Sequence, residues 1–117
     1  MILFKLGGSL LKNKNIYKCI NQIIKLKKKS VIVVGGGIFA NTVRNQQKTL
    51  MFNNLAAHNM SILSMIQMTY VVKSFFSNKL VFFEKINELK KIFFANKIPI
   101  WQPYSQIKSK SDSFTNW

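Results

Sequence analysis

The chain has 117 residues, which is enough for one small domain with its own hydrophobic core. A hydrophobic content of 48% excludes an intrinsically disordered tail. The single cysteine, Cys19, excludes an internal disulfide framework and a cysteine-based zinc site. The formal net charge of +15 suits an anionic partner, but charge alone does not identify one.

The distribution of this charge argues against a nucleic-acid partner. All the basic residues except Arg44 are lysines, and they extend from Lys5 to Lys110 with one dense run at Lys27–Lys29. Proteins that read bases or phosphates usually use arginine, whose planar group forms paired hydrogen bonds. The compositional bias of an AT-rich genome gives the same pattern. Nucleic-acid binding is therefore kept only as an alternative.

The uncharged stretch from Thr49 to Val72 raises the question of a membrane span. It contains too many polar side chains for the hydrocarbon core of a bilayer. The N-terminal sequence does not resemble a signal peptide, because Lys5 interrupts its apolar run. We expect a cytoplasmic protein without a membrane partner. The polar residues of the stretch are Asn53, Asn54, His58, Asn59, Ser61, Ser64, Gln67 and Thr69.

The first elements alternate between strand and helix. The apolar run Ile2–Leu6 predicts a strand that ends in a sharp turn at Gly7 and Gly8. Apolar residues at helical spacing predict a helix over Lys12–Lys29, with Asn13 or Asn15 as its cap. The β-branched run Val31–Val34 then predicts a strand buried on both faces, as in a parallel sheet.

The middle of the chain predicts two helices after a second glycine turn, Gly35–Gly37. The first helix covers Ile38–Gln47, with Phe39 and Val43 on one side. The second covers Met51–Phe76 and is apolar around most of its circumference, which is typical of a helix buried on more than one side. A protein core on one side and a second copy of the chain on the other would bury it, so we expect a possible homo-oligomer through this helix.

The last elements repeat the alternation. We expect a strand at Leu80–Phe83, a helix over Glu84–Ala95, and a strand at Ile98–Trp101 whose pairing is irregular because of Pro99. Irregular chain follows from Pro103. Strands that alternate with helices predict an α/β fold, a three-layer α/β/α sandwich with a mainly parallel sheet. The residues expected to face inward from the helix are Ile86, Leu89 and Phe93.

The two glycine turns are the main candidate for a functional site. Each follows a strand and precedes a helix, so a right-handed crossover places both at the carboxyl edge of one sheet, where such sheets bind ligands. Glycines let backbone N–H groups approach an anion, and a helix N-terminus adds partial positive charge. Neither turn matches the Walker pattern or GxGxxG. Lys5 lies late in its apolar strand, where it can either neutralise a phosphate or extend into solvent.

The sequence Lys5-Leu6-Gly7-Gly8-Ser9-Leu10 resembles the K-x-G-G-S motif that opens proteins of the amino-acid kinase family. Val33-Val34-Gly35-Gly36-Gly37 is similar to the second glycine turn of that family, on the acceptor side. The order and spacing agree, and the match extends to about Asn45. The resemblance implies an amino-acid-kinase-like fold and ATP-dependent phosphoryl transfer, with ATP and Mg²⁺ as cofactors.

The resemblance also implies roles for particular residues. Lys5 would neutralise charge on the transferred phosphoryl group, and Gly7, Gly8 and Ser9 would bind nucleotide phosphates. Gly35, Gly36 and Gly37 would hold a small anionic metabolite as the acceptor.

Two further residues have both a functional and a structural interpretation. Arg44 is a candidate for binding an anionic group of the acceptor, or it is an ordinary solvated helix residue. His58, the only histidine, lies in a polar line with Asn54 and Ser61 that either contacts the acceptor or is structural. No second ligand at suitable spacing supports a metal site built by the protein.

A narrower resemblance concerns one branch of the family, found in methanogens and methylotrophic bacteria. The segments Gly35–Ala40, Val43-Arg44 and Ala56-Ala57-His58, followed by a Met-rich helix, look like that branch. Its enzymes phosphorylate an aminomethylfuran phosphate in the biosynthesis of methanofuran-type cofactors.

The sequence departs from the family at its end. Family members have a second half that supplies the nucleotide pocket, an acidic residue and another phosphate-binding lysine, whereas this chain ends at Trp117. Its carboxylates, Glu84, Glu88 and Asp112, are few for a site that manages Mg²⁺ and phosphates. We expect residues 1–117 to be the N-terminal, acceptor-binding half of a kinase domain, with the nucleotide-binding C-terminal half absent. A fragment, a split or frameshifted gene, and a reduced protein all fit this expectation.

The predicted function is an ATP-dependent small-molecule kinase that phosphorylates a phosphate or carboxylate acceptor. Two alternatives remain: a non-catalytic remnant that binds an anionic metabolite, and a basic nucleic-acid-binding protein. The sequence does not identify the acceptor or the oligomeric state, and it does not establish whether the chain is active.

Overall fold

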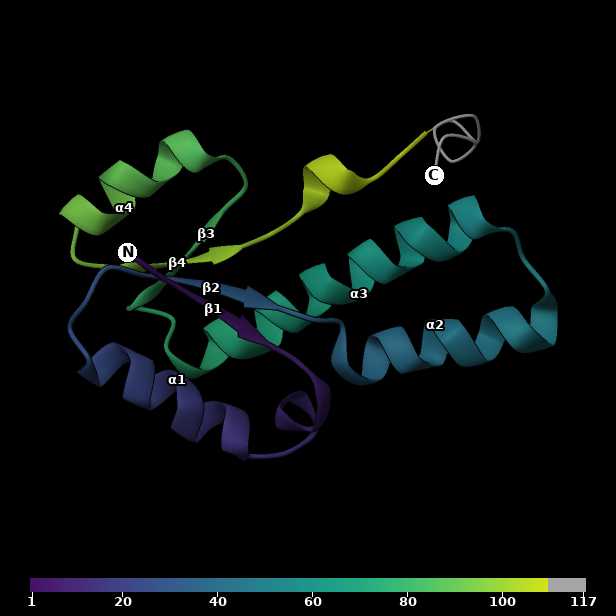
Figure 1. Ribbon diagram of the computed structural model, residues 1–117, viewed down its shortest axis with the longest axis horizontal. Helices are drawn as coiled ribbons and strands as arrows, with labels where there is room; N and C mark the ends of the chain where they lie inside the picture. The colour runs from purple at the N-terminus through teal and green to yellow at the C-terminus, as the bar shows by residue number, and fades with distance from the viewer. Residues whose placement is uncertain (110–117) are drawn as a thin grey trace.

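The computed structural model describes residues 1–109, which form a four-stranded sheet with helices on both faces (Figure 1). All strands run parallel, in the order β1-β2-β4-β3. The strands are β1 (Ile2–Leu6), β2 (Ser30–Val34), β3 (Leu80–Phe83) and β4 (Ile98–Trp101). The helices are α1 (Asn15–Lys25), α2 (Gly37–Leu50), α3 (Asn54–Phe75) and α4 (Leu89–Phe94). Three short 3₁₀ helices are η1 (Gly8–Lys12), η2 (Ile86–Glu88) and η3 (Tyr104–Gln106).

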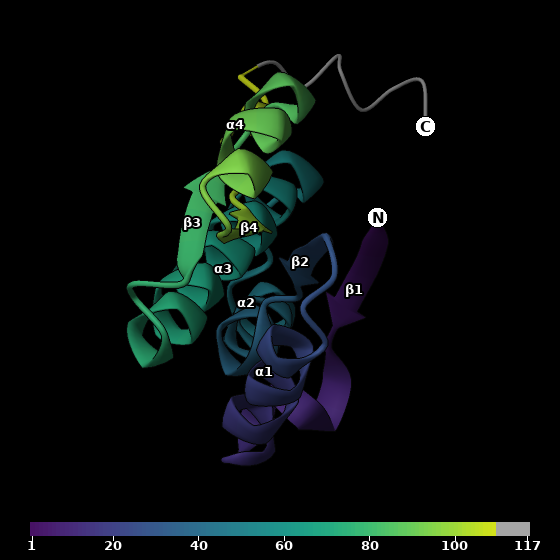
Figure 2. The ribbon, with the colours of Figure 1, turned by 90° about the vertical axis from the view of Figure 1, so that its left-hand side faces the viewer.

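The predicted α/β sandwich with a parallel sheet is confirmed. Figure 2 shows α4 on one face of the sheet, and α1 with α3 on the other. The larger core cluster lies on the side of α1 and α3, with Ile20, Ile32, Val72 and Ile100 almost fully buried. A smaller cluster around Val31 packs against α4. Alternate residues of β2 enter the two clusters, so both faces of this strand are buried, as its β-branched run predicted.

Strand β1 forms one edge of the sheet and is less covered than β2. Leu6 enters the larger core, whereas Leu3 and Lys5 point to the opposite face and remain exposed. The register pairs Lys5 with Val33 of β2. Lys5 is therefore a charged residue on the open face of an edge strand, one residue before the strand ends.

Helix α1 is shorter than the predicted Lys12–Lys29. A 3₁₀ helix takes residues 8–12, and the Asn13 side chain then accepts a hydrogen bond from the Asn15 N–H at 2.8 Å. The helix ends at Lys25, and Lys27 adopts a left-handed conformation with φ of 54°. The lysine-rich segment Lys27–Lys29 is consequently a loop that leads into β2.

The predicted helix Glu84–Ala95 is broken into η2 and α4. The Glu88 carboxylate accepts hydrogen bonds from the backbone N–H groups of Glu84 (2.7 Å) and Lys85 (3.0 Å) and holds this turn together. These hydrogen bonds lower the pKa of Glu88, first through Lys85 and then through Glu84. The prediction that Ile86 faces inward is wrong, because the turn leaves its side chain 82% exposed.

Helices α2 and α3 form a hairpin that extends beyond the sheet (Figure 1). Met51 ends α2 in a left-handed conformation, with φ of 56°, and the Asn53 side chain caps α3 through the Ala56 N–H at 2.8 Å. The long helix therefore begins at Asn54 rather than at Met51.

Pro99 limits the pairing of β4, as predicted. The N–H groups of Ile98 and Gln102 donate to β3 or its flanking residues, so Pro99 faces β2. Proline has no N–H to donate there. The pairing of β2 with β4 is reduced to one register pair, Ile32 with Ile100.

A buried polar pair fastens α3 to the chain after β4. The Gln102 side-chain amide donates to Thr69 Oγ1 at 3.1 Å, and this hydroxyl donates to the Ile66 carbonyl. Replacing Thr69 with valine keeps the shape but leaves a buried Gln102 donor without this acceptor. We expect a loss of about 1–3 kcal/mol in the free energy of unfolding, measured by urea denaturation.

Thr69→Ser is the matched control for this pair, because it keeps the hydroxyl and removes only a methyl group. It should cost less than Thr69→Val. A valine variant that is as stable as the serine variant would mean that the hydrogen bond contributes little.

Among residues 1–109, none of the helices is both long and apolar enough to cross a bilayer. The predictions that concern Asp112 and the boundary at Trp117 lie outside the described residues.

Candidate functional site

The two glycine turns lie side by side at the carboxyl edge of the sheet. The Gly35 N–H donates to the Leu6 carbonyl at 2.9 Å, which joins the end of β2 to the end of β1. A Cβ atom built on Gly35 would lie 3.9 Å from the Cα atom of Gly7. Two turns that are almost thirty residues apart in sequence thus form one continuous backbone surface.

Each glycine turn leads into a helix whose N-terminus has no side-chain cap. Gly7 is the N-cap residue of η1 and Gly36 that of α2, and neither helix receives a capping hydrogen bond from a side chain. The first N–H groups of a helix have no acceptor within the helix. Together with the partial positive charge of a helix N-terminus, they can bind an anion such as a phosphate.

The first glycine turn faces open space. A Cβ atom on Gly7 or Gly8 would have no heavy atom of the protein within 4 Å. Gly8 has a φ of +59°, a conformation that favours glycine, but Gly7 has an extended backbone that any residue adopts. Packing therefore gives no reason for a glycine at position 7. The bare backbone of this turn fits the close approach of a phosphate group.

The second glycine turn has a structural explanation. A Cβ atom on Gly36 would lie 2.5 Å from Ala40 Cβ and 3.0 Å from Ser64 Cβ. Gly37 has a φ of +57°, and its Cβ would lie 3.0 Å from the Met68 sulfur. Close packing against Ala40 and Ser64 thus requires glycine at position 36, and the left-handed backbone favours glycine at position 37, whether or not they also contact an acceptor.

A cleft of about 570 Å³ opens between α2 and α3 beside the second turn. Its walls include Phe39 and Thr42 of α2 and Leu63 and Ser64 of α3, and Ser64 is the residue that Gly36 approaches. The sequence did not identify this cleft, because only helix packing brings these residues together. The remaining lining residues are Val43, Met60, Ile66, Gln67, Tyr70 and Tyr104.

Tyr104 of η3 borders the same cleft beside Tyr70. A hydrogen bond between the two phenols raises the pKa of Tyr104, with smaller contributions from burial and from the nearby charge of Glu84. The Tyr70 ring also packs edge-on against Phe82, with 4.9 Å between ring centroids. The cleft is therefore mainly apolar, with hydroxyl groups at its rim.

Comparison with known proteins agrees with this arrangement. The family model of the amino acid kinase family matches residues 1–115, which is almost the whole chain. The chain belongs to the amino acid kinase family. No curated protein sequence matches it.

Two solved structures show the same fold. The uridylate kinase from Archaeoglobus fulgidus superposes with a TM-score of 0.68 at 18% sequence identity, covering 86% of this chain and 49% of that one. The UMP kinase from Bacillus anthracis superposes with a TM-score of 0.60 at 18% identity, covering 86% of this chain and 51% of that one. The chain thus spans about half the length of these kinases, and at this identity the likeness concerns the fold alone.

Arg44 and His58, two of the predicted site residues, lie away from the two glycine turns. Arg44 is exposed on α2, hydrogen bonded to Asn41, and seven residues or about 10 Å along the helix axis from Gly37. His58 Nε2 contacts the Gln106 carbonyl at 2.9 Å, and the neighbouring Asn59 side chain pairs with the backbone of Lys108. In these contacts His58 and Asn59 hold the chain after β4 against α3.

Acidic residues are scarce in the described part of this family member. Within residues 1–109 the only side-chain carboxylates are Glu84 and Glu88, and both are exposed. Those residues include no group of three or more His, Cys, Asp or Glu side chains that could hold a metal ion.

Proposed function

We propose that this chain provides the phosphate- and acceptor-binding half of an ATP-dependent small-molecule kinase. The observation that carries the proposal is the pair of adjacent glycine turns, each leading to an uncapped helix N-terminus, with Gly7 facing open space. Membership of the amino acid kinase family supports phosphoryl transfer as the reaction. Because the chain spans about half of the kinases that it matches, the activity of a complete enzyme is part of the proposal.

The residues of the first turn would bind and orient phosphates. Gly7 and Gly8 allow a phosphate to contact the backbone, and the first N–H groups of η1, around Ser9, have no side-chain cap and would donate to it. Lys5 lies two residues earlier on the open face of β1, where its ammonium group would neutralise negative charge. Bound ATP would supply the phosphoryl group, and these residues would position it, which is most of what such transfer requires.

The cleft between α2 and α3 is the proposed acceptor site. Its lining includes Ser64, which Gly36 approaches, so an acceptor in it would direct an anionic end toward the N-terminus of α2. Its apolar walls suit a small ring more than a chain of charges. An aminomethylfuran phosphate has both features, and the residues Gly35–Ala40 and Ala56-Ala57-His58 resemble the branch that uses it. The two solved structures are named for another phosphate acceptor, uridylate.

Binding measurements test both halves of this proposal. Amide resonances of Gly7, Gly8 and Ser9 should shift when ATP is added to the ¹⁵N-labelled chain, and those of Phe39, Thr42 and Ser64 when the acceptor is added. Aminomethylfuran phosphate and UMP are the two acceptors to compare. Shifts confined to other regions would contradict the proposed sites, even if the chain binds both compounds.

Filling the cleft should block the acceptor and spare the nucleotide. Leu63 lines the cleft and is 48% exposed, so tryptophan can replace it without disturbing the core. We expect Leu63→Trp to weaken acceptor binding at least about tenfold, because the indole occupies the acceptor's volume, and to leave ATP binding unchanged. Calorimetric titration with each compound checks this.

Leu50→Trp is the matched control, because Leu50 is exposed at the far end of α2 and does not line the cleft. If both tryptophan variants weaken acceptor binding equally, the cleft is not the acceptor site.

A second candidate function is a module that binds an anionic metabolite without transferring phosphate. The two exposed carboxylates of residues 1–109 favour it, because a phosphotransfer site manages several phosphates and their metal ions. This candidate predicts acceptor binding with no release of ADP when ATP is supplied to the chain.

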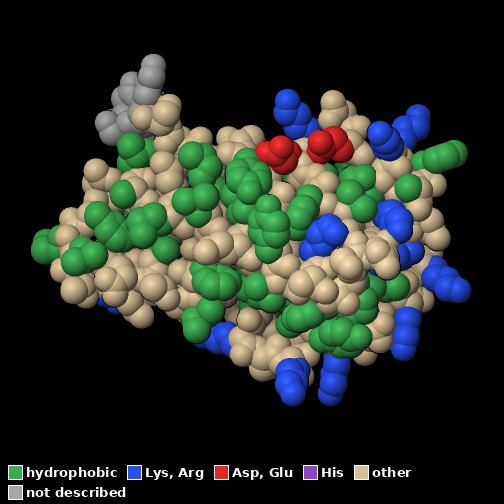
Figure 3. All heavy atoms as spheres, turned by 180° about the vertical axis from the view of Figure 1, so that it is seen from behind, with side chains coloured by type: hydrophobic (Ala, Val, Ile, Leu, Met, Phe, Trp, Pro, Cys, Tyr) green, Lys and Arg blue, Asp and Glu red, His purple; other side chains and the backbone are tan. Residues whose placement is uncertain are grey.

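We also propose that a second copy of the chain packs against α3. Met60, Leu63 and Tyr70 are exposed apolar side chains along this helix, and Figure 3 shows apolar groups distributed over the back of the molecule. A second copy would bury them and close the open side of the cleft. Sedimentation of the protein as a monomer at micromolar concentration would contradict this.

A further inference from the structure

Three loops at the amino edge of the sheet each place a lysine directly before a strand. Lys29 precedes β2, Lys79 precedes β3 and Lys97 precedes β4. Because the strands are parallel and adjacent, these loops meet at one edge, opposite the glycine turns. The lysines are far apart in the sequence, and the topology gathers them.

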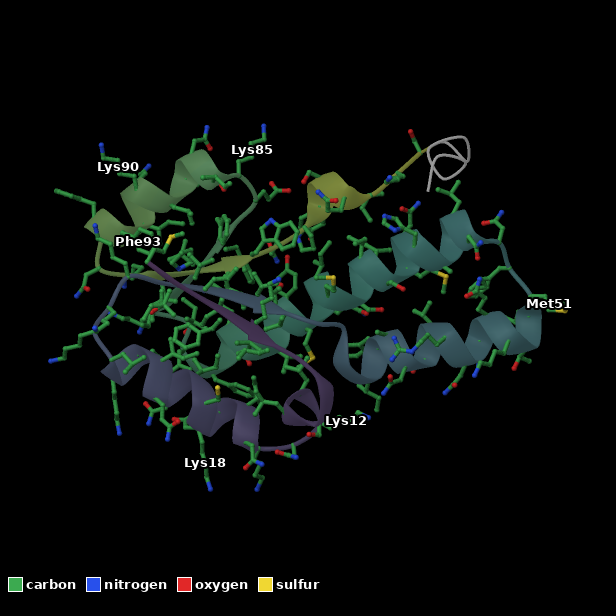
Figure 4. All side chains as sticks on the ribbon, viewed as in Figure 1. Lys12, Lys18, Met51, Lys85, Lys90 and Phe93 are labelled. Carbon is green, nitrogen blue, oxygen red and sulfur yellow. The ribbon has the colours of Figure 1, made fainter. Side chains whose placement is uncertain are left out.

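These loops surround a cleft of about 440 Å³. Phe93 contributes to its apolar wall, and Figure 4 places this residue at the end of the molecule opposite Met51. Figure 3 shows many of the Lys and Arg side chains at the same end of the molecule. The polar lining consists of Lys27, Lys28, Lys29, Lys79, Lys97 and Asn96.

The charge of this cleft is not balanced by nearby acids. Of the acids of residues 1–109, Glu88 lines a neighbouring cleft together with Lys97, whereas Glu84 follows the carboxyl end of β3, five residues or about 16 Å from Lys79 along that strand. This exceeds the screening length of about 8–10 Å at ordinary salt. Helices α1, α3 and α4 end at this edge, but their C-termini contribute only roughly half a negative charge each. Five lysines therefore leave a large positive excess.

Two of the lysines are held in position. Lys79 Nζ donates to the Asn96 carbonyl at 2.7 Å, and Lys97 Nζ donates to the Asn78 carbonyl. An ammonium group has three donors, so each retains capacity for a ligand. The side chains of Lys28 and Lys29 are exposed at the mouth of the cleft. The cleft is therefore lined by two lysines that hydrogen bonds hold in position and by two exposed lysines that can adjust to a ligand.

We propose that this cleft at the amino edge binds a compact polyphosphate anion, the triphosphate chain of a nucleotide or of inorganic tripolyphosphate. The cleft is concave and of a volume typical for a small ligand. A flat bilayer surface would not reach Lys79 and Lys97, which are half-buried. A nucleic-acid strand would need a groove that continues along its backbone. The inference does not depend on the kinase function, because the cleft lies at the edge opposite the glycine turns.

The test uses the full 117-residue chain carrying Lys5→Ala, so that phosphate binding at the glycine turns is weakened, and the amide shifts of Gly7, Gly8 and Ser9 report any binding that remains there. Tripolyphosphate is titrated at physiological ionic strength and followed by calorimetry and by amide resonances. We expect one site, with shifts at Lys28, Lys29, Asn96 and Lys97. The double variant K28Q/K29Q should bind at least about tenfold more weakly, because two ligand-facing charges are lost. Neither side chain is part of the fold's described hydrogen bonds, so folding should be retained.

The control K18Q/K48Q removes the same charge from exposed positions on α1 and α2, and it should change binding less than about twofold. Equal weakening by the two double variants would overturn the proposal, because net charge alone would then explain binding. Tighter binding of a single-stranded oligonucleotide than of tripolyphosphate, or of anionic phosphatidylserine vesicles, would overturn it in favour of those partners. ATP and tripolyphosphate binding equally well would identify the phosphate chain as the ligand, and tighter binding of ATP would identify a nucleotide.

Discussion

Replacing Gly36 with alanine should destabilise the protein by about 2–3 kcal/mol. The added Cβ atom would lie 2.5 Å from Ala40 Cβ on the next turn of α2 and 3.0 Å from Ser64 Cβ on α3. Neither neighbour is the mobile end of a long side chain, so the first turn of α2 must deform and α2 must also move away from α3 to make room. Chemical denaturation of Gly36→Ala and of the unmodified chain, followed by circular dichroism, measures the difference.

Gly7→Ala is the matched control in the adjacent turn. No heavy atom lies within 4 Å of its Cβ position, and its backbone is extended, so we expect a change within about 0.5 kcal/mol. The same methyl group would project into the space proposed for a phosphate, so ATP binding should weaken although stability does not change. If Gly36→Ala is as stable as Gly7→Ala, then Gly36 is not packed closely against Ala40 and Ser64.

These two glycines show what the sequence could and could not predict. Strand–Gly–helix order was enough to expect both turns at one sheet edge, because the path of a parallel crossover is set by general rules. The sequence could not distinguish a glycine required by packing from one with open space beside it. That difference depends on Ala40 of α2 and Ser64 of α3, which lie beside Gly36, whereas no heavy atom lies within 4 Å of the Cβ position of Gly7.

The elements themselves were predicted with similar limits. Strands such as Val31–Val34 have a strong local signal, and the structure confirms them. Helix ends were predicted less well, because they depend on particular hydrogen bonds. The Glu88 carboxylate accepts hydrogen bonds from the backbone N–H groups at the start of the predicted helix Glu84–Ala95. This turn interrupts the helix and leaves Ile86 exposed to solvent.

The lysines are the clearest case in which the fold adds information. In the sequence they are scattered, which argued for compositional bias rather than for a site. The order β1-β2-β4-β3 brings the loops before three strands to one edge, so that Lys29, Lys79 and Lys97 surround one cleft. The same topology places Lys5 near the other edge, beside the glycine turns.

Replacing Lys5 with methionine should remove most phosphate binding at the carboxyl edge. The change keeps an unbranched side chain and deletes the charge, and the side chain is exposed, so stability should change by less than about 0.5 kcal/mol. We expect ATP to bind at least about tenfold more weakly at the glycine turns. In a complete kinase, kcat should fall about 10²–10³-fold, because the lysine would stabilise charge that develops during transfer. The shifts of Gly7, Gly8 and Ser9 amides on adding ATP report this site separately from the lysine cleft.

Lys18→Met, on the exposed face of α1, is the charge-matched control and should bind ATP as the unmodified chain does. Lys5→Arg keeps the charge but changes its shape, so it should recover part of the binding and little of the turnover. If Lys5→Met and Lys18→Met behave alike, Lys5 is an ordinary solvated residue. Gly7→Ala then tests whether the backbone of the turn binds phosphate without the help of Lys5. If ATP binding is also unchanged in Gly7→Ala, the turn has no role in binding phosphate.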